Sequence, residues 1–150
     1  MSTLVAINRL SAIRTQLRSM STTVNKIVHT SSAPAAIGPY SQAITANGFV
    51  FCSGSLPVNP ATGDVVPGGV KEQAEQVLTN MGEVLKASNS SFSQIVKSTV
   101  FLKDMGDFAA VNEVYGKRLG GALPARSCVE VARLPKDVLV EIECIATVAK

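Results

Sequence analysis

The sequence has a single histidine, His29. One imidazole per chain excludes a histidine-rich metal site and a Ser/His or Cys/His catalytic triad assembled within one chain. Several classes of hydrolase and metalloenzyme are therefore excluded before any motif is considered.

Cysteines and long apolar runs are also scarce. The three cysteines, Cys52, Cys128 and Cys144, are odd in number, lie in hydrophobic stretches and form no CxxC motif. This pattern predicts buried free thiols in a reducing compartment rather than a disulfide framework. No apolar run approaches the roughly 18 residues that cross a bilayer, so we expect no membrane insertion.

Acidic residues are missing from the start of the chain, where no Asp or Glu precedes Asp64. Four basic residues lie in the first 26 residues, which we call the leader. The rest of the chain has 14 − 4 = 10 basic and 11 acidic residues, so the net charge of +3 belongs to the leader. The leader is rich in Ser and Thr, and its apolar residues recur at helical spacing: Leu4, Ile7, Leu10, Ile13 and Leu17.

This composition is typical of a mitochondrial presequence, which we assign to residues 1–20. A disordered tail and a basic amphipathic surface helix are the alternatives. An internal start at Met20 would add a cytosolic form. Residues 21–150 are expected to form a single domain.

The hydrophobic pattern of this domain alternates between strand and helix. It predicts a strand in 24–30, a hairpin in 41–55 around Asn47-Gly48, a loop over 56–69 and a strand in 94–104. A helix is predicted from Val70 to the polar stretch 88–91, with seven inward positions: Val70, Ala74, Val77, Leu78, Met81, Val84 and Leu85. A second helix is expected between Asp107, its N-cap, and Gly120-Gly121, with five inward residues: Phe108, Val111, Val114, Tyr115 and Leu119.

Two further strands flank the turn at 132–137, which gives the order β-β-β-α-β-α-β-β. We expect an α+β fold in which two amphipathic helices pack on one face of a mixed sheet and the other face stays uncovered. In the last strand Val138, Val140, Ile142, Cys144, Ala146 and Val148 share the core face, and in the preceding strand Arg126, Cys128 and Glu130 share one face.

A hairpin between these two strands with a six-residue loop would place Cys128 across from Glu141 and Arg126 across from Glu143. Arg126, Glu141 and Glu143 would then all lie on the face without helices. Either Arg126 forms a cross-strand ion pair on a solvated surface, or another subunit covers this face and Arg126 binds a substrate carboxylate. In the second case Glu141 would lie beside it as a base or a water-orienting group.

Other candidates carry weaker signals. Cys128 is either a nucleophile beside Arg126 or a small strand residue, and Tyr40 either lines a pocket or covers a core edge. Asn112 lies between core positions of the second helix, and Ser53 and Gly54 end a strand with exposed amides.

Four stretches in order, "APAAIGPYSQAI", "FCSGSLPVNP", "IVKSTVFLKDMGDFAAVNEVY" and "PARSCVEVARLPKDVLVEIECIA", resemble the Rid family, the reactive intermediate deaminases, also called the YjgF family. The resemblance runs from about residue 24 to the C-terminus. It implies a chorismate-mutase-like fold assembled as a homotrimer, with the sheets packed inward and ligand sites in the clefts between subunits.

The resemblance also implies an activity, the hydrolysis of 2-imino acids to 2-keto acids and ammonia without a cofactor or metal. Such an activity protects pyridoxal-phosphate enzymes and supports isoleucine biosynthesis and mitochondrial maintenance. By position, Arg126 matches the arginine that binds the substrate carboxylate and Glu141 matches the acid that positions water. Five further residues match the pocket: Tyr40, Ser53, Gly54, Asn112 and Cys128.

Two positions depart from the family pattern, because Ser55 stands where many members have Gln and Leu123 replaces a common Phe. A trimeric metabolite-binding or chaperone-like module is the alternative without catalysis. An endoribonuclease is the other alternative, but the chain after the leader lacks the basic, aromatic-rich surface of a nucleic-acid binder.

Overall fold

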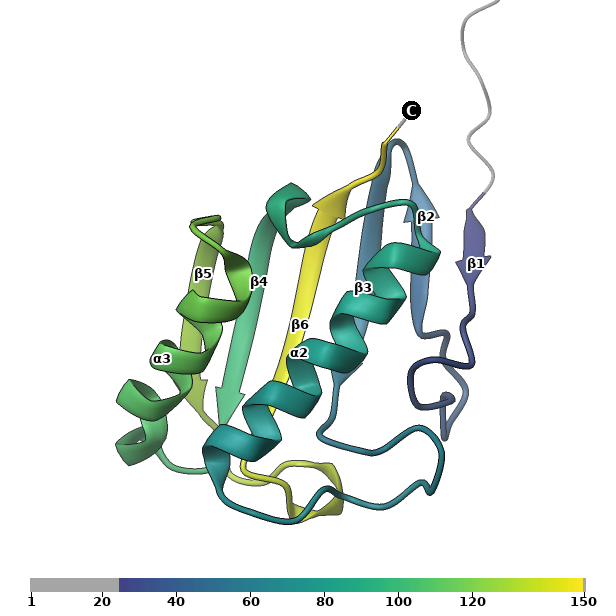
Figure 1. Ribbon diagram of the computed structural model, residues 1–150. Coiled ribbons are helices and arrows are strands. Elements are labelled where there is room, and N and C mark those ends of the chain that lie inside the picture. The colour runs from purple at the N-terminus through teal and green to yellow at the C-terminus, as the bar shows by residue number, and fades with distance from the viewer. Residues whose placement is uncertain (1–24, 150) are drawn as a thin grey trace, which may run out of the picture.

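The computed structural model describes residues 25–149, and the expected presequence in 1–20 lies outside them. Figure 1 shows the described part as one sheet with two long helices in front of it. The strands are β1 (Lys26–Val28), β2 (Ala43–Ala46), β3 (Phe49–Ser55), β4 (Ile95–Leu102), β5 (Ala125–Glu130) and β6 (Val140–Thr147). The helices are α2 (Val70–Ala87) and α3 (Phe108–Leu119), and three short 3-10 turns lie at Phe92–Gln94, Met105–Asp107 and Pro135–Asp137.

The sheet is mixed, with the strand order β1-β2-β3-β6-β4-β5. Strand β6 lies between β3 and β4 and is antiparallel to both, whereas β5 is parallel to β4. Helices α2 and α3 each make the crossover between two parallel strands, β3 to β4 and β4 to β5. Both crossovers run in the same direction across the sheet, and crossovers between parallel strands are right-handed, which explains why the two helices share one side of the sheet.

The local predictions for the first hairpin, for α2 and for the end of α3 are confirmed. Asn47 and Gly48 both have positive φ angles, 51° and 79°, as the tight turn between β2 and β3 requires. All seven expected inward positions of α2 are buried. Helix α3 ends at Gly120, whose φ of 60° is left-handed.

The start of α3 differs from the prediction. Asp107 occupies the N-cap position but makes no side-chain capping bond. Instead, Asp104 accepts a hydrogen bond from the Gly106 amide at 2.7 Å and caps the preceding 3-10 turn. Phe108, expected to point inward, is 39% exposed, because the first turn of α3 extends past the core. The other four expected inward residues, Val111, Val114, Tyr115 and Leu119, are buried.

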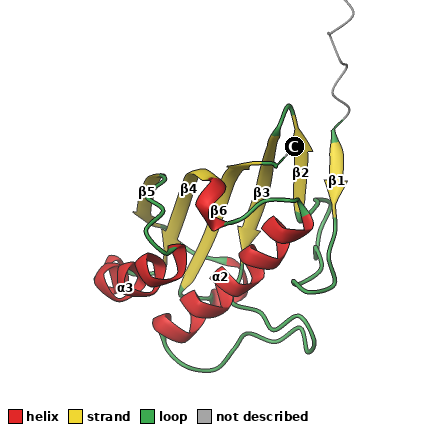
Figure 2. Cartoon of the chain, turned by 45° about the horizontal axis from the view of Figure 1, so that its top comes forward, coloured by secondary structure: helices red, strands yellow, loops and turns green. Residues whose placement is uncertain are grey.

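Both helices pack on the same side of the sheet, as Figure 2 shows. We call this side the helix face. The register places on it Val28, Ala43, Val50, Cys52, Ser98, Val100, Arg126, Cys128, Ile142 and Cys144. Most of these residues are buried against α2 and α3 and form the single core of the described chain.

The opposite side of the sheet, which we call the open face, carries no helix. The register places on it Ile27, Ile44, Phe51, Thr99, Phe101, Ser127, Val129, Glu141, Glu143 and Ile145. Several of its large apolar side chains are exposed, among them Ile27, Phe51 and Val129. Exposed apolar side chains gathered on one face are typical of a surface that takes part in an interaction. Within residues 25–149, neither helix is long and apolar enough to cross a membrane.

The expected hairpin between the last two strands is wrong. Strand β4 separates β5 from β6, so Cys128 pairs with Val100 and Arg126 with Ser98, not with Glu141 or Glu143. Ser98 is buried on the helix face, and Arg126 therefore points to that face as well. Glu141 and Glu143 do lie on the open face. The α3 crossover, which forces β5 to pair in parallel with β4, is the reason for the difference.

Candidate functional site

The predicted site residues fall into two groups. One group, which we call the Arg126 group, consists of Asn112, Arg126 and Cys128. Arg126 and Cys128 lie two residues apart on β5 and so share a face of the strand. Asn112 follows Phe108 by four residues and precedes Tyr115 by three, so these three side chains form one stripe along α3.

Arg126 lies against that stripe. The guanidinium carbon is 4.9 Å from the centroid of the Tyr115 ring and 5.8 Å from that of Phe108. Contacts of this length are cation–π interactions. Asn112 therefore lies between the two rings that contact the arginine, and the prediction that Asn112 and Arg126 belong to one site is compatible with the structure.

The Arg126 guanidinium makes no ion pair and no hydrogen bond with any other residue in 25–149. Arg118 is the instructive contrast, because it also lies over a ring, that of Phe92 at 5.9 Å. Arg118 donates to Glu75 at 2.8 Å and to Thr79 at 3.1 Å, so its charge is compensated within the chain. The half-buried Arg126 is not compensated in this way, and its five N–H donors are available to an anionic ligand.

Cys128 does not have the environment of a nucleophile. Burial raises the pKa of its thiol, and the Arg126 charge opposes that shift only in part. A thiol with a raised pKa is a poor nucleophile at neutral pH. Of the two interpretations of Cys128, the small strand residue is therefore the one that fits.

The second group, which we call the Glu141 group, consists of Tyr40, Ser53, Gly54 and Glu141. Glu141 lies on β6 and packs directly on Gly54 of β3, where a β-bulge interrupts the pairing between Cys52 and Ser55. A Cβ atom on Gly54 would overlap the Glu141 carboxylate. Position 54 must therefore be glycine for the carboxylate to lie where it does.

The electrostatic environment of Glu141 favours its protonated form. Burial is the main cause and the nearby Glu143 carboxylate the second, and together they raise the pKa of Glu141 above its usual value. No cation among the described residues pairs with it. A carboxyl with a raised pKa accepts and returns a proton near neutral pH more readily than an ordinary surface Glu.

Tyr40, Ser53 and Gly54 line one cavity of about 240 Å³, and Glu141, which contacts Gly54, is not part of its wall. The Ser53 hydroxyl donates to the Ser41 carbonyl at 2.7 Å, and the Tyr40 hydroxyl accepts a long bond of 3.4 Å from the Ile37 amide. Much of the remaining wall is apolar, including Ile37 and Leu56, and Lys136 is its only charged residue. Its volume is below the roughly 300–1,000 Å³ of pockets that hold drug-sized ligands, so it suits a smaller molecule.

Gln42, which is not among the predicted site residues, holds the loop that forms one wall of this cavity. Its side chain is buried, and its amide donates to the carbonyls of Thr30, Ala33 and Pro34. Its oxygen accepts from the Thr30 amide at 2.8 Å. A buried Gln side chain with these hydrogen bonds has a structural role, because it fixes the conformation of the loop.

The two groups do not meet within one chain. Arg126 is level with Ser98 of β4 and Glu141 with Phe101, three residues along the same strand and on the opposite face. Three residues correspond to about 10 Å along a strand, and β5 and β6 lie about 10 Å apart across the sheet. The thickness of the sheet adds to this separation, so one substrate molecule cannot contact both side chains of the same subunit.

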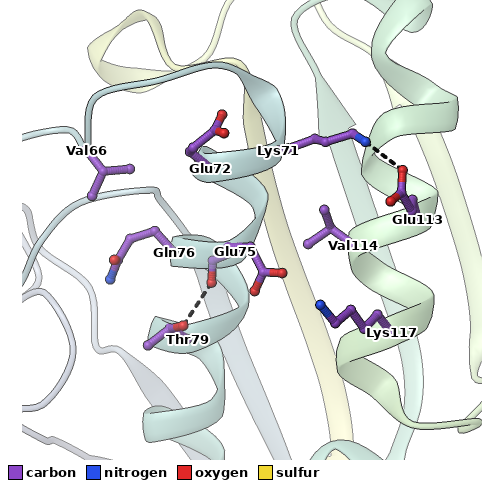
Figure 3. A pocket seen from close by; sticks show the side chains of 9 residues that line it. All are labelled: Val66, Lys71, Glu72, Glu75, Gln76, Thr79, Glu113, Val114 and Lys117. Carbon is purple, nitrogen blue, oxygen red and sulfur yellow. Dashed lines mark hydrogen bonds and ion pairs between the residues drawn. The ribbon is translucent and has the colours of Figure 1, made fainter.

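A larger depression of about 440 Å³ lies between α2 and α3 and contains none of the predicted site residues (Figure 3). The ion pair between Lys71 and Glu113, 2.6 Å long, spans it from one helix to the other. Its other charged side chains, including Glu72 and Lys117, lie on a solvent-exposed surface. We interpret this depression as the polar seam between the two helices. Among residues 25–149, no group of three His, Cys, Asp or Glu side chains could hold a metal ion.

The chain matches a known protein family over nearly all of the described residues. Residues 30–148 match the model described as Endoribonuclease L-PSP. The chain is 52% identical over 127 residues to the goat (Capra hircus) protein named 2-iminobutanoate/2-iminopropanoate deaminase, and the match covers 85% of this chain and 93% of that protein. It is 53% identical over 129 residues to Reactive Intermediate Deaminase A, chloroplastic, of Arabidopsis thaliana, covering 86% and 69% of the two chains.

The fold is also found in solved structures. The crystal structure of E. coli TdcF with bound serine superposes with a TM-score of 0.78 at 46% sequence identity. The match covers 83% of this chain and 99% of that one.

Proposed function

Because the chain belongs to the endoribonuclease L-PSP family, which includes the reactive intermediate deaminases, we propose that it hydrolyses 2-imino acids such as 2-iminopropanoate and 2-iminobutanoate to 2-keto acids and ammonia. One observation in the structure supports this most directly. An uncompensated, ring-stacked arginine and a carboxyl with a raised pKa lie on opposite faces of the same sheet. In this proposal the arginine is one half of the site and the carboxyl is the other, and the reaction needs both.

We propose that the complete site lies between two copies of the chain. The Arg126 group of one subunit faces the Glu141 group of the next, and a ring of three subunits makes three such sites. The exposed apolar side chains of the open face, among them Ile27, Phe51 and Val129, support this arrangement, since packing the open faces together in a trimer would remove them from water.

The substrate binds through its carboxylate in this proposal. The planar Arg126 guanidinium donates two parallel hydrogen bonds to the two carboxylate oxygens, which fixes the orientation of the imine carbon. Asn112 and the Cys128 backbone border the same end of the substrate. Tyr40, Ser53 and Gly54 line the other side, and the apolar wall of their cavity receives a small alkyl side chain.

Hydrolysis then needs one water molecule and one proton acceptor. Glu141 accepts a proton as the water oxygen bonds to the protonated imine carbon, giving an amino alcohol. The same carboxyl returns the proton to the nitrogen. The C–N bond then breaks as Glu141 takes up the hydroxyl proton, so that the hydroxyl becomes a carbonyl and ammonia leaves. Glu141 passes this second proton to ammonia, which departs as ammonium, and is a carboxylate again. The protonated imine is already electrophilic, so orientation and proton transfer suffice and no covalent nucleophile is needed.

We also propose that residues 1–20 direct the chain to mitochondria, where the activity protects pyridoxal-phosphate enzymes from reactive enamines and supports isoleucine biosynthesis. The support is the acid-free, Arg-bearing composition of this leader. Fluorescent fusions with and without residues 1–19 test the targeting. They are expected to appear in mitochondria and in the cytosol, respectively, and identical cytosolic signals would contradict it.

An assay coupled to a pyridoxal-phosphate dehydratase tests the proposed reaction. The full-length protein is expected to accelerate keto-acid release, and Arg126→Ala is expected to lower kcat/KM by about 10²–10⁴-fold, because two charge-assisted hydrogen bonds are lost. Sedimentation should show the same oligomer for both. An unchanged rate in Arg126→Ala would contradict the proposal.

A further inference from the structure

Ring stacking is what holds Arg126 in the Arg126 group. The guanidinium lies over Tyr115 at 4.9 Å and over Phe108 at 5.8 Å, and no carboxylate among the described residues fixes it. An arginine positioned by a salt bridge has donors occupied by its partner, as Arg118 does with Glu75. An arginine positioned by aromatic faces keeps the edge of its fork free, because the contact uses the flat side of the guanidinium.

The Tyr115 ring is itself fixed. Its hydroxyl is 2.7 Å from the Ser98 hydroxyl, and Ser98 is 1% exposed. Ser98 is also the register partner of Arg126 on the neighbouring strand. The Ser98–Tyr115 hydrogen bond therefore ties the ring to the position in the sheet from which the arginine extends.

Phe108 completes the arrangement from the other end of the stripe. It begins α3, seven residues or about two helical turns before Tyr115, and 39% of it is exposed. An exposed Phe contributes little to the core, and its ring nevertheless lies within cation–π distance of Arg126. The Phe108 ring thus lies beside the arginine and outside the buried core.

We infer that Phe108 and Tyr115 form an aromatic shelf that orients the Arg126 guanidinium for a substrate carboxylate, with Ser98 fixing the shelf. These are positioning residues, which act through Arg126. The inference rests on the proposed function, since it assigns the shelf a role in substrate binding. It also predicts that the shelf affects the affinity for the carboxylate and leaves the proton transfer at Glu141 unchanged.

Phe108→Leu tests the shelf, because leucine keeps apolar volume and removes the aromatic face. We expect the KM of the coupled reaction and the Kd for 2-oxobutanoate, a keto-acid product, to rise about 3- to 30-fold, while kcat changes less than about 2-fold. Phe108→Tyr, which restores a ring, should bind as the wild type does. Phe92→Leu is the matched control, since it removes the ring under Arg118, and should leave KM and Kd unchanged.

The inference would be overturned by wild-type affinity in Phe108→Leu, or by the same loss in Phe108→Tyr as in Phe108→Leu. Thermal unfolding of each variant shows whether a loss follows from instability instead, which would also overturn it. Arg126→Ala in the same titration separates the two proposals. If Arg126→Ala loses affinity and Phe108→Leu does not, only the role of the shelf is wrong. If Arg126→Ala binds normally, both the proposed function and the role of the shelf are wrong.

Discussion

The Arg126 group and the Glu141 group differ in charge, in the face of the sheet that they occupy and in what surrounds them. The first has a cation stacked on two rings, on the helix face, without an anionic partner. The second has a carboxyl with a raised pKa, on the open face, with a second carboxylate nearby and no cation. Each group contains the charge that the other needs. A charge without a partner within one chain is what the proposed division of the site between subunits predicts.

The largest effect is expected from Glu141→Gln, which separates substrate binding at the Arg126 group from turnover at the Glu141 group. Glu141→Gln keeps the shape of the side chain and removes the proton acceptor, so kcat should fall about 10²–10⁴-fold. The Kd for 2-oxobutanoate, measured by titration calorimetry, should change little. A module that only binds keto acids would have no rate to lose, and a comparable loss of affinity would contradict the division of roles.

Gly54→Ala tests whether the position of the Glu141 carboxylate matters for turnover. The added methyl overlaps the Glu141 carboxylate, which must move. We expect kcat to fall about 10-fold, since displacing a catalytic group by about 1 Å has effects of this order or larger. Gly116→Ala is the matched control, because no atom lies within 4 Å of its added methyl. Wild-type kcat in Gly54→Ala would show that the carboxylate position is unimportant.

Tyr115→Phe tests the Ser98–Tyr115 hydrogen bond, which fixes the ring beside Arg126. It keeps the ring but leaves the buried Ser98 hydroxyl without its partner, which should cost about 1–3 kcal/mol in the free energy of unfolding. Urea denaturation measures this loss. Tyr40→Phe removes a hydroxyl that accepts only a 3.4 Å bond near the surface and should cost less. Equal costs in the two variants would contradict the assigned role of the Ser98–Tyr115 bond.

The smallest effect concerns Glu143, whose charge raises the pKa of Glu141. Activity needs an ionised Glu141, so the rate should fall as the pH drops through that pKa. Glu143→Gln removes the repulsion and lowers the pKa of Glu141, which shifts the acidic limb of the kcat profile to lower pH. Glu113→Gln, on the exposed side of α3, should leave the limb in place. An upward shift in Glu143→Gln would refute this assignment.

Most local structure could be predicted from the sequence, because short-range patterns decide it. The Asn47-Gly48 turn, the apolar stripe of α2 and the end of α3 at Gly120 each depend on residues a few positions apart. The same holds for the alternation along β6, whose even-numbered residues from Val140 to Ala146 are buried as expected.

The pairing of β5 could not be predicted in this way. Alternation within the strand showed that Arg126 and Cys128 share a face but not which face, because that depends on the neighbouring strand. The adjacent position of β5 and β6 in the sequence favoured a hairpin, and the helix before β5 was the overlooked signal for parallel pairing with β4. The spacing of Phe108, Asn112 and Tyr115 on α3 was a second overlooked signal.

Mixing two inactive variants tests the division of the site between subunits most directly. Arg126→Ala and Glu141→Gln are unfolded together in equal amounts, refolded and assayed. If each site takes its arginine from one chain and its glutamate from another, random assembly gives two intact halves in about one site in four, whatever the number of subunits in the ring. If the site is divided between subunits, the refolded mixture should show about one quarter of the wild-type rate. No recovery above the two variants refolded separately would contradict it.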